Sequence, residues 1–536
     1  TAPDPLAALQ RQAQNSRSKG IVSHNSPDMG TLFKQVGVVG AGAMGQGIAQ
    51  MAVQAGTQVR LLDAAEGAAA KAIAAIHTQW QKGLEKGRLT ADQVSLWQQR
   101  LLAAKALPDL FDSDLVIEAV VENPTVKQSL FQALEQGLSS QAVIATNTSS
   151  LSVTALAASL KHPARFAGLH FFNPVPLMKV VEVIPGLATA PEVCDQLTQL
   201  VQAMGHQAVR AKDTPGFIVN HAGRAYGTEA LRTVSEGVAD FATIDAILKD
   251  QVGFKLGPFE LMDLTALDVS HPVMESIYHQ YYEEPRYRPS VITAQRLAGG
   301  WLGKKTQRGF YDYSGGVMQV APLPAPPKIE TFPPVWVSSR AARRADLLQL
   351  LKNLDARIET SSAPSPEALC LVAPLGFDVT TCAIVERLDP ARTLGIDMLM
   401  PDAATRRRVL AVNPATRLDF RYAAHALLAR DGKAVSVIGD SGGFVTQRVL
   451  AQIVNIASDI CQQRICTPQD LDLAVHLGLG YPKGPLALGD TLGADSLLEV
   501  LFNMQTVYGD PRYRPSPWLR RRGALGLSLL HPDSTP

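Results

Sequence analysis

The sequence predicts an α/β domain with a doubly wound sheet, followed by an all-α domain and then by a degenerate, shortened repeat of the same pair. Three observations lead to this prediction. Apolar runs alternate with helical patterns over residues 34–212, which is typical of a sheet covered by helices. Residues 213–316 show helical patterns only. Motifs that begin at residue 213 then recur from residue 440, an offset of 227 positions.

The composition is that of an ordinary globular protein of several domains. The 536 residues are 46% hydrophobic and the net charge is +1, so bulk charge favours neither nucleic acid nor a membrane as partner. The five cysteines are scattered and no Cys or His pair completes a metal site, so we expect no metal and a reducing cytoplasm. Residues 1–33 form a polar tail without a signal-peptide core, and Met29 is a candidate native start.

A glycine turn between the first two expected strands is the strongest motif of the chain. An apolar run at 35–39 is followed by Gly40-Ala41-Gly42-Ala43-Met44-Gly45, a helical pattern and a second apolar run that ends at Asp63. This order, with an acid about 20 residues after the glycines, is the dinucleotide fingerprint of a Rossmann-type domain. Backbone N–H groups of the turn would meet a pyrophosphate. Asp63 would accept from a ribose 2′-OH, which favours NAD over NADP.

The remaining elements of the first half follow in order. Two helical patterns, at 64–83 and 90–102, form an excursion from the sheet, and a capping box at Thr90 opens the second. Further strands are expected at 115–121, 142–145, 166–172, 179–184 and 207–211. Their alternation with helices implies a parallel sheet, whose ligands bind at the carboxyl ends of strands. Glu122, Ser149 and His170 lie at or just beyond such ends.

The chain then becomes helical at Asp213. Helices are expected at 218–236, 243–252, 256–281 and 293–298. Residues 303–313 are hairpin-like, and residues 317–334 are a proline-rich linker.

Two adjacent strand segments carry residues that suit an NAD-dependent alcohol oxidation. Such a reaction needs a base for the hydroxyl proton, and His170 is a candidate, although a structural histidine is the alternative. Glu182 lies within an apolar run, where a carboxylate is expensive to bury unless it is paired. Ser149 and Asn220 are neutral donors for a carbonyl oxygen, with a cap or a turn as the alternative reading of each.

Seven segments together resemble the 3-hydroxyacyl-CoA dehydrogenase family over about residues 34–314. They are VGVVGAGAMG, VIEAVVEN, TNTSSLSVT, FAGLHFFNPVPLMKVVEVI, KDTPGFIVN, GPFELMDLTALD and GKKTQRGFYDY. The resemblance implies that His170 is the general base, that Glu182 orients it, and that Ser149 and Asn220 position substrate oxygens. It also implies NAD as cofactor and an (S)-3-hydroxyacyl-CoA substrate.

The resemblance further implies which residues bind the two ligands. The cofactor contacts carry over to the glycine turn and to Asp63, Glu122, Lys127, Ser149, Asn173 and Lys305. The helical excursion contributes to CoA binding in the family, so Lys82 and Lys86 are candidates, with a solvated helix end as the alternative.

The second half repeats the first without its chemistry. In the register of the repeat, Ser149 becomes Gly376, His170 becomes Asp397, Glu182 becomes Val409 and Asn220 becomes Gln447. No glycine turn follows the first apolar run. We therefore expect a vestigial α/β domain at 335–439 and a second helical domain at 440–536. The two helical domains would form an intramolecular pseudo-dimer, as two subunits of the family do, and a further homo-oligomer stays open.

Two helical copies on one dehydrogenase resemble the tandem branch of the family associated with phenylacetate catabolism, which acts on 3-hydroxyadipyl-CoA. Fatty-acid β-oxidation, with 3-hydroxybutyryl-CoA, is the other setting. Arg224 lies one helical turn after Asn220 and is a candidate for a terminal carboxylate, with a salt bridge to a neighbouring helix as the alternative. A dehydrogenase of a non-CoA hydroxy acid, like the gulonate-oxidising lens-crystallin relatives, and a non-catalytic NAD-binding scaffold are the other readings.

Overall fold

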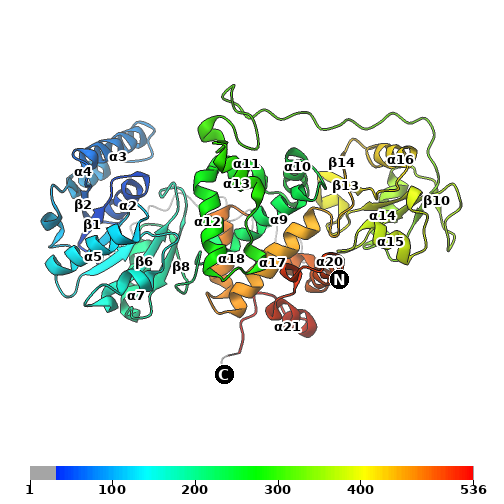
Figure 1. The fold of residues 1–536 in the computed structure, drawn as a ribbon. Helices are drawn as coiled ribbons and strands as arrows, with labels where there is room; N and C mark the ends of the chain where they lie inside the picture. Colours follow the sequence, from blue (N-terminus) through cyan, green and yellow to red (C-terminus); the bar gives the residue numbers. More distant parts are fainter. Residues whose placement is uncertain (1–31, 535–536) are drawn as a thin grey trace, which may run out of the picture.

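The computed structural model describes residues 32–534 (Figure 1). The polar tail expected at 1–33 therefore lies outside the described residues, except for Leu32 and Phe33. Two α/β domains lie at opposite ends of the molecule, and the helices of the two helical domains lie between them. The predicted fold class is confirmed.

The first domain is built on an eight-stranded sheet in the order β3-β2-β1-β4-β5-β6-β7-β8. Its strands are β1 Gln35–Val39, β2 Gln58–Leu62, β3 Leu101–Ala103, β4 Leu115–Glu118, β5 Val143–Thr146, β6 Phe166–Phe171, β7 Val180–Pro185 and β8 Gln207–Arg210. Its helices are α2 Ala43–Gln54, α3 Ala68–Glu85, α4 Ala91–Arg100, α5 Pro124–Gly137, α6 Val153–Ala157 and α7 Pro191–Ala203. The expected excursion is the α3–α4 pair, and Thr90 forms the expected capping box.

The expectation of a fully parallel sheet is wrong at one pair of strands. β6 and β7 run antiparallel, whereas all other neighbours in this sheet are parallel. Residues 172–179, which join the two strands, are too few for the crossover helix that a parallel pair needs. The antiparallel register places His170 directly opposite Glu182.

The first helical domain contains more and shorter helices than expected. They are α8 Val219–Ala222, α9 Arg224–Ser235, α10 Phe241–Val252, α11 Pro258–Thr265, α12 Leu267–Gln280 and α13 Val291–Ala298. The helix expected at 218–236 is divided at Gly223 into α8 and α9. The helix expected at 256–281 is broken at Ala266, whose φ of 68° no α-helix can contain.

The second half repeats this construction around a six-stranded sheet in the order β10-β9-β11-β12-β13-β14. Its strands are β9 Val335–Val337, β10 Ile358–Glu359, β11 Leu369–Val372, β12 Thr393–Ile396, β13 Arg407–Ala411 and β14 Ala434–Ile438. Its helices are α14 Arg344–Asn353, α15 Val379–Val385, α16 Leu418–Leu428, α17 Thr446–Gln462, α18 Pro468–Leu479, α19 Pro485–Leu492, α20 Ala494–Tyr508 and α21 Pro517–Leu525. β12 and β13 repeat the antiparallel pairing of β6 and β7.

The two helical domains pack on each other through α9 and α17. The Lys212 amide donates to the Ile465 carbonyl and the Gly439 amide donates to the Val238 carbonyl, both at 2.8 Å. In the repeat, Lys212 corresponds to Gly439 and Val238 corresponds to Ile465. Each bond is therefore the equivalent of the other in the opposite half, as a local two-fold axis requires. Each helical domain also contacts the other half's sheet, because α18 packs on β7 and β8 while α10 packs on β13.

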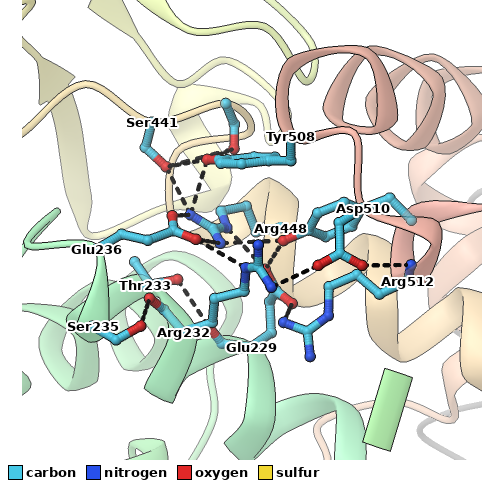
Figure 2. A network of polar contacts seen from close by, with 12 residues as sticks. Glu229, Arg232, Thr233, Ser235, Glu236, Ser441, Arg448, Tyr508, Asp510 and Arg512 are labelled. Carbon is cyan, nitrogen blue, oxygen red and sulfur yellow. Dashed lines mark hydrogen bonds and ion pairs between the residues drawn. The ribbon is translucent and has the colours of Figure 1, made fainter. Parts of the chain in front are cut away.

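A buried ionic network crosses the contact between α9 and α17 (Figure 2). We call Glu229, Glu236, Arg448 and Arg512 the interface network. The fully buried Arg448 guanidinium contacts Glu229 Oε1 at 2.9 Å and Glu236 Oε2 at 2.7 Å. Burial acts to raise the pKa of Glu229, but the charges of Arg448 and Arg512 outweigh it and hold this pKa below its ordinary value.

The Arg448–Glu229 pair of this network has no charged equivalent across the two-fold axis. The counterparts of Arg448 and Glu229 in the repeat are His221 and Ile456. Burial lowers the pKa of His221 to about 3, so this imidazole is neutral at physiological pH, although Arg286 pairs with Asp459 nearby. The His221 ring contacts the Tyr287 hydroxyl at 2.7 Å instead. No helix among residues 32–534 is both long enough and apolar enough to cross a membrane.

Candidate active site

The strongest feature of the site is a buried histidine–carboxylate pair on β6 and β7. His170 Nδ1 lies 2.6 Å from Glu182 Oε2. Glu182 Oε1 accepts from the Ile218 and Val219 amides, each at 2.9 Å. Because a carboxylate in this position only accepts, it holds the proton on Nδ1. The other ring nitrogen, Nε2, makes no hydrogen bond with any residue of 32–534, so it is available to a ligand.

The surroundings of the pair come from three elements. Phe172 and Phe217 flank the imidazole, with ring centroids 4.4 and 5.9 Å away. Asn220 lies in α8, one residue after the amide that binds Glu182. Ser149 follows β5, the neighbour of β6, so the structure brings all four expected catalytic residues to one region.

The glycine turn is shaped by close backbone contacts. Gly40 has a φ of 106°, and a Cβ there would lie 2.4 Å from the Ala119 carbonyl oxygen. A Cβ at Gly45 would lie 1.7 Å from the Gly40 oxygen. At Gly42, in contrast, a Cβ would meet nothing within 4 Å, so this face of the turn is open to a phosphate. Asp63 accepts from the Ala41 amide at 2.7 Å, which holds the acid against the turn. The turn therefore fits the pyrophosphate of NAD.

Glu122 and Lys127 are already bound to each other. Lys127 is 1% exposed, and its ammonium contacts Glu118 Oε1 at 2.5 Å and Glu122 Oε2 at 3.1 Å. Burial acts to raise the pKa of Glu122, but the Lys127 charge and a hydrogen bond from Thr148 outweigh it and lower this pKa. Glu122 also accepts from the Ser149 amide at 3.0 Å. Lys127 therefore holds Glu122 in place, and the buried Glu118 is a partner that the sequence reasoning missed.

The remaining ligand candidates are exposed. Asn173 is the second residue after β6. Lys305, from the first helical domain, pairs with Asp268 at 2.5 Å. Lys82 and Lys86 lie at the carboxyl end of α3.

A cavity of about 290 Å³ adjoins the catalytic region. It is mostly apolar, and its lining includes Phe172, Asn220, Arg224, Met274, Leu479 and Tyr481. We call it the α8–α18 cavity, because Leu479 ends α18 of the second half. Leu479 and Tyr481 were missed in the sequence, where nothing local connects them with residues near position 220.

Arg224 is a charged residue in the lining of this cavity. Its Nε–H donates to the Asn220 carbonyl at 2.8 Å, and burial lowers its pKa to about 10, so the group stays cationic at neutral pH. The alternative reading, a salt bridge to a neighbouring helix, is absent among residues 32–534. An enclosed cation without a carboxylate suits an anionic ligand.

The corresponding region of the second half is closed by its own side chains. Gln447 donates to Asp397 Oδ1 at 2.9 Å and to the Pro374 carbonyl at 3.0 Å, and accepts from the Gly376 amide at 2.9 Å. The Asp397 amide bonds the Val409 carbonyl, so the expected register of the repeat is confirmed. Burial raises the pKa of Asp397 to about 6. No base with a carboxylate partner remains at this position.

Two family models match the chain. The NAD-binding domain of 3-hydroxyacyl-CoA dehydrogenase matches residues 35–214, and the C-terminal domain of the same enzyme matches residues 216–313 and again residues 443–528. The double match agrees with the repeat of the helical domain.

Some similar proteins match both halves of this chain, and others match its first half only. The chain is 38% identical over 491 residues to 3-hydroxyadipyl-CoA dehydrogenase of Escherichia coli, which covers 91% of this chain and 97% of that one. It is 40% identical over 287 residues to a 3-hydroxybutyryl-CoA dehydrogenase of Bradyrhizobium diazoefficiens, covering 54% of this chain and 98% of that one. A crystal structure described as 3-hydroxybutyryl-CoA dehydrogenase from Escherichia coli superposes with a TM-score of 0.79 at 37% identity, covering 92% and 98% of the two chains.

Proposed function

The chain belongs to the 3-hydroxyacyl-CoA dehydrogenase family of NAD-dependent enzymes that oxidise hydroxyacyl-CoA, and we propose that it converts (S)-3-hydroxyacyl-CoA to 3-oxoacyl-CoA at a single site in its first half. The observation that carries the proposal is the buried His170–Glu182 pair, with one histidine nitrogen fixed and the other available.

His170 acts as the general base. Its Nε2 takes the proton of the C3 hydroxyl, and the carboxylate of Glu182 stabilises the imidazolium that forms. NAD, when bound, accepts the hydride that leaves C3. The two backbone amides on Glu182 hold its carboxylate in place, so it orients the ring. Ser149 and Asn220 hold the C3 oxygen and the thioester carbonyl as charge develops on them.

The cofactor site is made by the glycine turn, with Asp63 at the ribose and with Glu122, Ser149, Asn173 and Lys305 beyond it. Lys127 contributes through Glu122, because its ammonium is buried against two carboxylates. Lys82 and Lys86, exposed at the carboxyl end of α3, would meet the anionic part of CoA.

The acyl chain of the substrate ends in a carboxylate. The α8–α18 cavity is lined by both Asn220 and Arg224, and the Arg224 guanidinium lacks a carboxylate partner within residues 32–534. The Escherichia coli relative named 3-hydroxyadipyl-CoA dehydrogenase supports this choice. The relatives named for 3-hydroxybutyryl-CoA make a short monocarboxylic chain the second candidate. Breakdown of aromatic acids such as phenylacetate fits the first, and fatty-acid β-oxidation fits the second.

The second helical domain serves as a covalently attached partner subunit. The paired bonds of Lys212 and Gly439 support a pseudo-dimer, since they have the isologous form of a two-fold interface. Tethering replaces association from solution, so the interface forms at high effective concentration.

An NADH-forming assay with 3-hydroxyadipyl-, 3-hydroxyhexanoyl- and 3-hydroxybutyryl-CoA tests the substrate. We expect the highest kcat/KM with 3-hydroxyadipyl-CoA, and a loss of at least about tenfold in that preference in Arg224→Ala, because a charge-assisted bidentate contact disappears. Equal preferences in wild type and variant would remove Arg224 from substrate binding. Activity with free hydroxy acids alone would identify a non-CoA dehydrogenase, and no turnover at all would identify a scaffold.

A further inference from the structure

The α8–α18 cavity contains a second polar group that its surroundings do not satisfy. Tyr481 is 3% exposed, and its hydroxyl has no hydrogen-bond partner among residues 32–534. A buried hydroxyl without a partner is unfavourable and needs an explanation. Tyr481 lines the same cavity as Arg224, although the two residues belong to different halves of the chain.

The packing of α18 fixes the position of Tyr481. The helix contacts α8, β7 and β8, and it ends at Gly480 in a left-handed conformation. Tyr481 therefore emerges beside the Asn220–Arg224 turn. Its carbonyl oxygen accepts from His476 Nδ1 at 2.7 Å, and its ring packs against Phe254 and Tyr226 with centroids 5.1 and 5.8 Å away. The hydroxyl is thus held on a rigid support.

Packing alone does not require the hydroxyl at this place. The counterpart of Tyr481 in the repeat is Phe254, which occupies the equivalent position without an oxygen. Tyr226, the neighbouring tyrosine, donates its hydroxyl to the Leu256 carbonyl at 2.8 Å. Tyr481 is therefore the tyrosine in this aromatic group that lines the cavity and whose hydroxyl has no acceptor among residues 32–534.

The chemistry of the two groups is complementary to one kind of ligand. Burial raises the pKa of Tyr481, so its hydroxyl stays protonated and can donate. The Arg224 guanidinium offers further N–H donors and a positive charge. Two donors of this kind, in a mostly apolar cavity, match the two oxygens of one carboxylate.

We propose that the Tyr481 hydroxyl, supplied by the second helical domain, donates to the terminal carboxylate of the acyl chain beside Arg224. This inference rests on the proposed dicarboxylic substrate. It gives the second half a part in substrate choice, although that half has lost its own catalytic residues.

The test compares kcat/KM for 3-hydroxyadipyl-CoA and 3-hydroxyhexanoyl-CoA, which differ in the terminal carboxylate. We expect Tyr481→Phe to lower the ratio of the two values about tenfold, mainly through KM for the dicarboxylic substrate. Tyr226→Phe is the matched control, because it removes a hydroxyl of the same aromatic group whose hydrogen bond goes to the backbone. We expect it to leave the ratio of the two kcat/KM values unchanged. Thermal unfolding of both variants shows that they fold.

Each other outcome overturns a stated part of the account. A wild-type enzyme without preference for the dicarboxylic substrate would overturn the proposed substrate and, with it, the role of Tyr481. A wild-type preference that Tyr481→Phe retains would overturn the role of Tyr481 alone. An equal loss with both substrates in Tyr481→Phe would show that the hydroxyl acts on structure.

Discussion

The strand pairs β6–β7 and β12–β13 have the same directions and corresponding registers, but only the first carries a histidine–carboxylate pair. On β6 and β7, Glu182 has both oxygens bonded and His170 keeps one nitrogen for a ligand. On β12 and β13, Asp397 faces Val409, and Gln447 closes over the site. The same fold is therefore present at both places, and the difference lies in the side chains. Only the first leaves a ring nitrogen, His170 Nε2, without a partner in the described part of the chain.

The largest expected effect separates the two strand pairs by activity. His170→Gln should lower kcat by about 10²–10⁴-fold, because the proposed general base is lost. NADH should still bind, since the glycine turn is unchanged. Asp397→Asn, at the matching position, is the control and should keep kcat within about twofold. Turnover of His170→Gln within about tenfold of wild type would remove His170 as the base.

The second prediction concerns the Arg448–Glu229 pair of the interface network. Arg448→Met leaves the buried Glu229 with Arg512 at 3.5 Å as its remaining cation and with a hydrogen bond from the Tyr513 hydroxyl, so we expect a loss of about 3–5 kcal/mol in unfolding free energy. Arg448→Met combined with Glu229→Ile should recover part of this loss, because the buried carboxylate is removed with its partner, while Arg512 loses its own contact to Glu229. Denaturant unfolding of both variants measures the difference. A cost below about 1 kcal/mol for the single variant would contradict the network's role.

The third prediction uses the raised pKa of Asp397. Its pKa is about 6 in the folded protein against an ordinary value of 3.8, so its contribution to stability is complete below pH 3.8 and is lost as the pH rises through 6. Asp397→Asn should not show this loss of unfolding free energy, because its amide does not titrate. The variant should exceed wild type by up to about 3 kcal/mol at pH 7.5, with the difference shrinking towards zero as the pH falls below 4. Urea unfolding across this pH range measures it, and a pH-independent difference would be inconsistent with a raised Asp397 pKa.

The smallest expected effect concerns the glycine turn, which the second half lacks. Gly42→Ala should fold normally, because a Cβ there meets nothing within 4 Å. It should weaken NADH binding at least about tenfold, or about 1.4 kcal/mol, because the methyl group keeps the pyrophosphate from the backbone. Fluorescence titration measures the affinity, and unchanged binding would place the pyrophosphate elsewhere.

Much of the fold and of the candidate site could be predicted because local patterns carry it. The glycine turn and the strands around it follow from spacing within about 30 residues. The repeat was visible as matching motifs, and the register that it implied for Asp397 and Val409 is confirmed. The antiparallel β6–β7 pair was missed, although the short connection at 172–179 contained the signal.

Other features depend on contacts between distant parts of the chain. Tyr481 reaches the cavity only through the packing of α18 on β7 and β8, and the pair of Arg448 with Glu229 depends on the local two-fold axis. Lys127 reads as an ordinary helical lysine, because its partner Glu118 lies on a strand and nothing in their spacing shows that they pair. Tertiary packing decides these contacts, so the local pattern does not contain them.

Calorimetric titration of the full chain with NADH tests most directly that the two halves contain a single active site. The glycine turn after β1 is open at Gly42, whereas β9 is followed by Ser338 and no such turn. The account predicts one NADH bound per chain, and the same stoichiometry in His170→Gln. Two NADH molecules per chain would contradict it.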